Sequence, residues 1–218
     1  MKVKWLGHAT FLVTSNSGTT ILIDPYEAGG YNNAIGYGPI SEEADVVLVT
    51  HEHGDHNNVK AAKGNPTVIR GVGTHSAKGL TFKGVATYHD KSQGKERGPN
   101  TVFIFEVDGV NVCHAGDLGH LLTEEQVKEI GEVDLFLVPV GGRATLDAQE
   151  ATDVAAQIKA RVIVPMHFKT PKLGFPFAPV DDFLQGKSNV RRAGSAEIEL
   201  KKEGLPASPE VVVMDYAL

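Results

Sequence analysis

A seven-residue segment, Thr50 to His56, constrains this chain more than any other part of its sequence. It reads THEHGDH and follows four apolar residues, Val46 to Val49. Three imidazoles and one carboxylate lie close together here, and these are ligands that borderline divalent metals prefer. A strand ending near Thr50 would project alternate histidines from one side of a loop, while Asp55 and the last histidine reach a second point nearby. The segment therefore predicts a site for two metal ions after a buried strand.

Apolar runs and turn residues predict several other strands. The segment Val46–Val49 is entirely apolar, which is typical of a strand buried on both faces. Two later segments flank Asp108-Gly109, a favoured two-residue hairpin turn. The remaining expected strands are short apolar runs bounded by turn residues. In chain order the other expected strands are Lys2–Leu6, Thr10–Thr14, Thr19–Asp24, Thr101–Val107, Val110–His114, Leu135–Val138 and Val162–Pro165.

Two helices have clear N-terminal signals in the second half of the chain. Each begins with a capping-box pattern, in which a Thr or Asp is followed three residues later by Gln or Glu. The longer helix also has apolar residues on a single face, which predicts that this face packs on the core. The expected helices are Glu124–Ile130, after Thr123, and Ala148–Lys159, after Asp147.

The composition limits the class of protein and its partners. A chain of 218 residues with 41% hydrophobic and 22% charged residues is expected to form one domain, residues 1–218. No apolar run approaches the ~20 residues that span a bilayer, and we interpret the N-terminal segment as a strand rather than a signal peptide. The single cysteine agrees with a reducing cytoplasm. A net charge of -6 gives no basic face for nucleic acid, so neither a nucleic-acid nor a membrane partner is expected.

Four motifs, taken in this order, resemble the metallo-β-lactamase superfamily. They are ILIDP at residues 21–25, THEHGDH at 50–56, Ala115-Gly116-Asp117 and Pro165-Met166-His167. The chain is most similar to the branch of small metal-dependent hydrolases that includes L-ascorbate-6-phosphate lactonase. The resemblance runs from Gly7-His8-Ala9 to His167 and implies an α/β (α+β) fold: a four-layer αββα sandwich of two mixed sheets flanked by helices.

The resemblance also implies a ligand set for two metals. Asp117 would lie between them as a bridging carboxylate. One metal would be held by His51, His53 and His89, and the other by Asp55, His56 and His167. Because these donors are nitrogen and oxygen without thiolate, they suit Zn²⁺ or Mn²⁺, with Fe²⁺ also acceptable.

Two histidines compete for one position in this set, His89 and His114. If Val110 to Asp117 formed one continuous strand, His114 and Asp117 would point to opposite faces and could not share a metal pair. His89 instead ends an apolar run and opens a polar loop. We therefore expect His89 to be the ligand and His114 to be a hydrogen-bonded histidine of the core or beside the site.

Four further residues are candidates for supporting roles, each with a simpler alternative. Asp24 could accept hydrogen bonds that hold the histidine loop, or could be a turn residue before a proline. His8 is either near the site or a half-buried structural histidine. His120 could reach the site as a proton donor or lie on the surface. Arg143 follows a strand and could bind a phosphate or carboxylate, or could be a solvated loop charge.

The ligand set predicts a metal-dependent hydrolase. Two metals ~3.5–4 Å apart lower the pKa of water and polarise a carbonyl or phosphoryl group. Asp55 and Asp117 are the expected catalytic residues, and the substrate would be a small ester, lactone or phosphodiester. Basic residues near the metals could bind a phosphate or carboxylate group of an anionic substrate. The alternative is a protein of this fold without hydrolytic activity: a di-iron redox protein or a binding module that retains its metals.

Overall fold

Two β-sheets form the centre of the protein, and the computed structural model describes residues 1–218. The first sheet has six strands in the spatial order β13-β1-β2-β3-β4-β5. Their bounds are β1 Lys2–Gly7, β2 Thr10–Thr14, β3 Thr20–Ile23, β4 Val46–Val49, β5 Thr67–Arg70 and β13 Glu197–Glu199.

The second sheet has eight strands in the order β12-β14-β11-β10-β9-β8-β7-β6. Their bounds are β6 Gly73–Ala77, β7 Leu80–Tyr88, β8 Pro99–Val107, β9 Val110–His114, β10 Leu135–Pro139, β11 Val162–Met166, β12 Val190–Arg192 and β14 Glu210–Val213. All seven strands predicted from the short apolar runs, and the buried strand β4, are confirmed, with ends that differ by a few residues. Asp108 and Gly109 have φ angles of 52° and 78° at the predicted hairpin turn.

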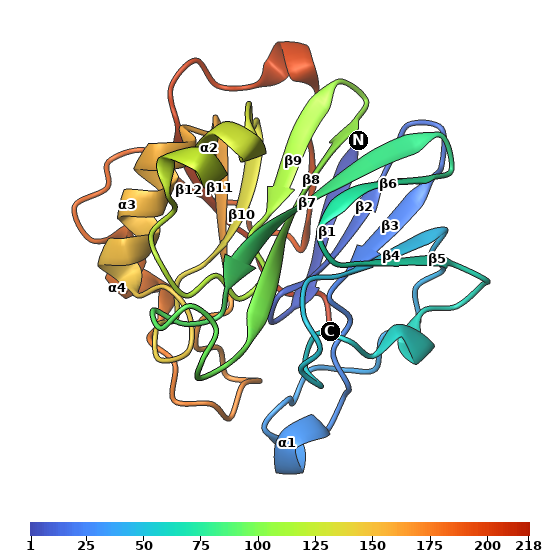
Figure 1. The fold of residues 1–218 in the computed structure, drawn as a ribbon, viewed down its shortest axis with the longest axis horizontal. Helices are drawn as coiled ribbons and strands as arrows, with labels where there is room; N and C mark the ends of the chain where they lie inside the picture. Colours follow the sequence, from blue (N-terminus) through green and yellow to red (C-terminus); the bar gives the residue numbers. More distant parts are fainter.

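The strand directions place many loops at one edge of the sandwich. Strand β1 is antiparallel to β2, β2 is antiparallel to β3, and β3 is parallel to β4. Strands β1, β3 and β4 therefore run the same way. By the same reasoning β7, β9 and β11 share one direction in the second sheet. The loops after β4 and β7 reach the same, lower side of the molecule in Figure 1.

Side chains alternate between two hydrophobic clusters along the first sheet. On β4, Val46 and Leu48 belong to the large cluster between the sheets, whereas Val47 and Val49 belong to a smaller cluster on the outer face. Successive side chains of a strand point to opposite faces. Burial on both faces therefore explains why this strand is apolar throughout, and why the loop that follows it starts from a rigid base.

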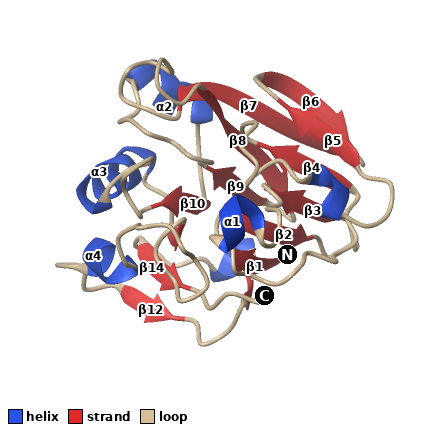
Figure 2. Ribbon diagram, turned by 90° about the horizontal axis from the view of Figure 1, so that it is seen from below, coloured by secondary structure: helices blue, strands red, loops and turns tan.

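Helices cover the outer face of the eight-stranded sheet. These are α2 Glu124–Ile130, α3 Ala148–Ile158 and α4 Val180–Leu184. In Figure 2, α2 lies beside β7, whereas α3 and α4 lie beside β10, β12 and β14. Both predicted capping boxes are present, at Thr123 and Asp147. None of the helices in the structure combines the length and the apolar character that crossing a membrane requires.

The outer face of the six-stranded sheet is covered mainly by a long loop. This loop follows β3 and contributes Tyr26, Ile35 and Tyr37 to the smaller hydrophobic cluster. It contains one short turn that the sequence did not predict, α1 Gly30–Asn33, in which three residues have positive φ. The predicted sandwich of two mixed sheets is confirmed. On the outer face of the six-stranded sheet, this loop forms most of the layer that helices were expected to form.

Candidate metal centre

Six side chains that can bind a metal come from the ends of strands that share a direction. Each follows the last residue of its strand by no more than three positions. Ligands of open sheets gather at the carboxyl ends of the strands for this reason. The six are His8 after β1, Asp24 after β3, His51 after β4, His89 after β7, Asp117 after β9 and His167 after β11.

The first group, which we call the His51 cluster, consists of His51, His53 and His89. One ligand atom of each lies within 4.8 Å of the others. The Nδ1 atom of His89 is 2.8 Å from the carbonyl oxygen of Ala144, which can only accept a hydrogen bond. Nδ1 therefore carries the proton, and the Nε2 lone pair of His89 faces the centre of the site.

The second group, the His56 cluster, consists of His8, Asp55, His56 and His167, again with one ligand atom each within 4.8 Å of the others. His56 Nδ1 donates to Asp24 Oδ2 at 2.9 Å. Its Nε2 atom is buried and has no hydrogen-bond partner. The Asp24 hydrogen bond thus fixes the ring of His56 with its free nitrogen turned toward Asp55 and Asp117.

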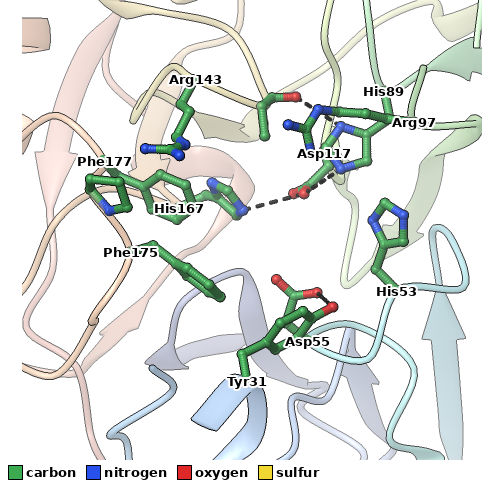
Figure 3. A pocket seen from close by; sticks show the side chains of 12 residues that line it. Tyr31, His53, Asp55, His89, Arg97, Asp117, Arg143, His167, Phe175 and Phe177 are labelled. Atoms are coloured by element: carbon green, nitrogen blue, oxygen red, sulfur yellow. Dashed lines mark hydrogen bonds and ion pairs between the residues drawn. The ribbon is translucent and has the colours of Figure 1, made fainter. Parts of the chain in front are cut away.

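Asp117 lies between the two clusters and contacts both. Its Oδ2 atom is 3.0 Å from His89 Nε2, 3.3 Å from His167 Nε2 and 3.8 Å from His51 Nε2. Its Oδ1 atom is 3.3 Å from His56 Nε2. Figure 3 shows the carboxylate at the floor of a pocket, with His89 and His167 turned toward it. One carboxylate therefore offers an oxygen to each of two neighbouring positions.

Gly116 allows Asp117 to approach the histidine loop. Its φ angle is 57°, and a Cβ atom at this position would lie only 2.7 Å from the Cβ atom of Thr50. Asp117 N donates to Asn100 Oδ1 at 3.0 Å. The turn after β9 thus needs glycine for both its backbone conformation and its close packing.

Burial and charge set the protonation of these groups in opposite directions. Burial lowers the pKa of His51 to about 3, so its ring is neutral at pH 7 and can act as a ligand. Burial also acts against charge on His56, but Asp117 and Asp55 outweigh it and raise the pKa of His56 well above its usual value. Although burial opposes its ionisation, Asp117 keeps a pKa well below the usual range because His167 and His56 surround it.

The donor set fits a pair of divalent cations. Five buried side-chain atoms of the protein lack any hydrogen-bond partner, and all five belong to this site: His8 Nδ1, His51 Nε2, His56 Nε2, Asp117 Oδ1 and His167 Nδ1. An unpaired buried polar atom costs about 1–3 kcal/mol, so a cluster of them indicates a ligand-binding site. Because three of these atoms point into the two clusters from His51, His56 and Asp117, the residues fit metal ions.

Asp24 holds the histidine loop rather than lining the pocket. Its Oδ1 atom accepts from Thr50 N at 2.8 Å, and its Oδ2 atom accepts from Thr50 Oγ1 at 2.6 Å and from His56 Nδ1. Asp24 is also within 4.8 Å of ligand atoms of His51 and His56. Since both of its oxygens already accept hydrogen bonds, we interpret it as the residue that orients His56.

We expect Asp24→Asn to weaken metal binding without removing a ligand. The amide has only one accepting oxygen, whereas the carboxylate accepts from Thr50 N with Oδ1 and from His56 Nδ1 with Oδ2. Either the backbone of the histidine loop or the ring of His56 therefore loses its hydrogen bond. Outer residues of this kind change metal affinity by about 10–100-fold. Competition with a metal-binding dye measures the effect, and Asp182→Asn on the surface of α4 is the control. Equal metal affinity in Asp24→Asn and wild type would contradict this role.

His8 is fully buried within the His56 cluster. Its Nε2 atom lies 3.0 Å from Asp55 Oδ2, and its ring is 4.3 Å from the ring of His167. Its carbonyl oxygen accepts from Trp5 Nε1 and from His167 N, at 3.0 and 3.1 Å. The structure therefore places His8 at the site, beside Asp55. This agrees with the first of the two alternatives, a histidine near the site, and not with a half-buried structural histidine.

His114 and His120 do not line the pocket. His114 is buried, with Nε2 2.9 Å from the carbonyl oxygen of Ala9, while Nδ1 accepts from Gly116 N at 3.0 Å. The strand ends at His114, as predicted, so the condition of one continuous strand to Asp117 does not apply. The two hydrogen bonds instead hold the His114 side chain away from the clusters. His120 Nε2 accepts from Tyr88 N, and its Nδ1 donates to the carbonyl oxygen of Leu121. These contacts favour its surface alternative over a proton donor.

The pocket above the site has a volume of about 490 Å³. It is lined by Asp117, by side chains of the two clusters and by residues from four loops. Arg143 is among them, and so are six other residues outside the predicted ligand set. These six are Tyr31, Arg97, Ala144, Phe175, Pro176 and Phe177. Nothing in the sequence marks the three aromatic residues as part of the site.

Comparison with known proteins gives consistent matches over most of the chain. The sequence model of a family described as "Beta-lactamase superfamily domain" matches residues 2–167. A "UPF0173 metal-dependent hydrolase" from Thermococcus onnurineus is 34% identical over 195 residues, covering 78% of this chain and 85% of that protein. A protein of the same description from Methanoculleus marisnigri is 30% identical over 227 residues, covering 94% and 95%.

A solved structure is similar over the full length. It is a Thermotoga maritima protein described as belonging to the metallo-beta-lactamase superfamily, with 42% sequence identity and a TM-score of 0.82. The alignment covers 99% of each chain. The fold of the chain is therefore similar, over its full length, to that of a protein of experimentally determined structure.

Proposed function

The chain belongs to the metallo-β-lactamase superfamily and is a metal-dependent hydrolase, and we propose that it uses two divalent ions to cleave a small ester, lactone or phosphodiester with water. The observation that carries this proposal is the position of Asp117, which contacts imidazoles of both clusters through its two oxygens. Zn²⁺ or Mn²⁺ suits these nitrogen and oxygen donors, and Fe²⁺ is a third candidate.

Each of the two clusters would bind one metal ion. His51, His53 and His89 would hold one ion, and Asp55, His56 and His167 the other, with Asp117 between them. Once bound, such a pair supplies an ionised water at neutral pH and polarises the scissile group. The protein fixes the rings of His56, His51 and His89, which would hold the ions, through Asp24, Thr50 and the carbonyl of Ala144.

Asp55 is the residue we propose to handle the proton of the attacking water. Its Oδ1 atom accepts from the Tyr31 hydroxyl at 3.1 Å, and its Oδ2 atom faces His8 Nε2 at 3.0 Å. Burial and the negative charge of Asp55 raise the pKa of Tyr31 to about 12, so this hydroxyl stays protonated and donates. The carboxylate is therefore held from two sides at the edge of the pocket, where it can orient a water molecule.

The size of the pocket supports a small-molecule substrate. A volume of about 490 Å³ lies within the usual range for ligand pockets, roughly 300–1,000 Å³. The net charge of -6 favours a small molecule over nucleic acid. We also propose that the protein works in the cytoplasm, because its one cysteine, Cys113, is free and buried.

The test is turnover by protein of known metal content. We expect protein loaded with Zn²⁺ or Mn²⁺ to hydrolyse at least one class among esters, lactones and phosphodiesters. Removal of the metal by a chelator, followed by dialysis, should abolish turnover, and addition of the same metal should restore it. Metal-loaded protein that is inactive toward all three classes would contradict the proposal and favour a redox or binding role.

A further inference from the structure

Two arginines at the mouth of the pocket have no acidic partner. The chain has six arginines. Three of them form ion pairs: Arg70 with Glu52, Arg191 with Glu210 and Arg192 with Asp181. Of the three that form none, two line the pocket above Asp117. These are Arg97 and Arg143, both exposed to solvent.

The loop that carries Arg97 is closed on a single buried carboxylate. Asp90, next to His89, accepts hydrogen bonds from four backbone N–H groups of the loop, including that of Arg97 at 2.8 Å. The loop that begins at a residue of the His51 cluster is therefore a fixed turn, and it returns Arg97 to the mouth of the pocket.

The turn that carries Arg143 is also tied to His89. Gly142 and Arg143 both have positive φ angles, 67° and 62°. This conformation is unfavourable for a non-glycine residue and tends to persist where a function requires it. The next residue, Ala144, accepts the hydrogen bond from His89 Nδ1 at 2.8 Å. Both arginines thus come from segments that fix His89.

The carboxylates around these arginines are engaged elsewhere. An adjoining hollow of about 310 Å³ is lined by Asp90, Glu96, Asp147 and Glu150 together with both arginines. Asp90 holds its loop, and Glu96 accepts from Ser92 Oγ at 2.5 Å. Asp147 and Glu150 form the capping box of α3, and Glu150 also pairs with Lys91. Neither guanidinium is neutralised by an ion pair.

The opposite side of the pocket is aromatic. Figure 3 shows Tyr31 and Phe175 on the side of Asp55, across from Arg97 and Arg143. The rings of Tyr31 and Phe175 pack edge to face, with centroids 5.4 Å apart, and the ring of Phe177 lies 5.3 Å from that of Phe175. Phe175 and Phe177 are only partly buried. They present apolar surface to whatever fills the pocket.

This aromatic side is a constructed wall rather than two loose loops. Gly174 N donates to the carbonyl oxygen of Ala34 at 2.7 Å, and Gly36 N donates to that of Lys172 at 2.7 Å. Lys169 Nζ donates to the carbonyl oxygens of Phe175 and Leu173. The loop that carries Tyr31 and the loop that carries Phe175 are therefore joined by their backbones.

From this arrangement we propose, resting on the hydrolytic function above, that the substrate joins an anionic small molecule to an aromatic or otherwise apolar group. The anionic part would bind Arg97 and Arg143, and the apolar part would pack on Tyr31, Phe175 and Phe177. The scissile ester bond would lie between them, over Asp117. In the reaction, water oxygen adds to the acyl carbon, the C–O bond to the alcohol breaks, and the alcohol leaves with a proton from the water.

Four esters test separately whether the arginines recognise the anionic group and whether the aromatic residues recognise the apolar group. They are O-benzoylglycolate, O-acetylglycolate and the neutral methylamides of both. Metal-loaded wild type should prefer each charged ester over its amide and each benzoyl ester over its acetyl counterpart, by about tenfold or more in kcat/KM for the charge. The double variant R97Q/R143Q should lose most of the charge preference, R97K/R143K should keep part of it, and F175A should reduce the benzoyl preference.

Arg161→Gln is the matched control, because Arg161 also lacks an ion pair but lies outside the pocket; it should keep both preferences. Titration calorimetry with the same four esters measures binding alone. If no ester is hydrolysed but benzoylglycolate binds wild type and not R97Q/R143Q, the substrate proposal stands while the hydrolysis of esters fails. An unchanged charge preference in R97Q/R143Q, or wild type that prefers neutral esters in turnover and binding, would overturn the inference.

Discussion

Asp117→Ala should leave the protein with about one metal ion per chain or fewer and almost no turnover. Asp117 lies between the two clusters, within 3.0–3.3 Å of His89, His167 and His56. Without it, positively charged or metal-bound imidazoles would face one another in a buried site. Since a catalytic metal contributes several kcal/mol to the transition state, we expect kcat to fall by roughly 10³-fold or more.

Metal content and kcat measured on the same preparation test this prediction. Wild type purified without chelator should carry close to two ions per chain. Asp182→Ala, on the exposed side of α4, is the control and should match wild type. Circular dichroism then distinguishes loss of metal from loss of fold. Asp117→Ala protein with wild-type metal content and turnover would exclude the dinuclear site.

The central strands could be predicted because burial determines their sequence. The strand β4 is buried on both faces and is apolar at every position, and β10 and β11 are likewise buried throughout. The strands that were missed lie at or near the sheet edges. The edge strand β6, GTHSA, has no buried residue, and β12 has only three residues. Edge strands of this kind carry polar residues that avoid association, and therefore give no hydrophobic period to detect.

The residues of the site also differed in how far the sequence could predict them. The segment 50–56 is a local pattern, so its residues could be proposed from spacing alone. His89, Asp117 and His167 are far apart in the chain, and the resemblance to a family was needed to connect them. The aromatic wall could not be predicted, because the position of Phe175 depends on a backbone hydrogen bond between Gly174 and Ala34. Contacts of that range leave no mark in a single sequence.

His89→Ala should remove metal and activity, whereas His114→Gln should mainly reduce stability. Both histidines are buried, but their ring nitrogens make different hydrogen bonds. His89 donates from Nδ1 to Ala144 and leaves Nε2 facing Asp117 at 3.0 Å. His114 uses Nε2 on the carbonyl of Ala9 and Nδ1 on Gly116 N. Only His89 has a nitrogen left for a metal.

The two variants should therefore differ in metal content and in the free energy of unfolding when both are measured. His89→Ala should lose about one ion per chain and reduce kcat by ~10²-fold or more, because one metal keeps two of its three imidazole ligands. His114→Gln should keep both ions, and the lost hydrogen bonds should lower the free energy of unfolding by about 1–3 kcal/mol. The reverse result, with metal lost from His114→Gln and retained in His89→Ala, would mean that the first cluster is completed by His114. Because the turn at Gly116 connects His114 to Asp117, some loss of activity in His114→Gln is compatible with the prediction only if its metal content is unchanged.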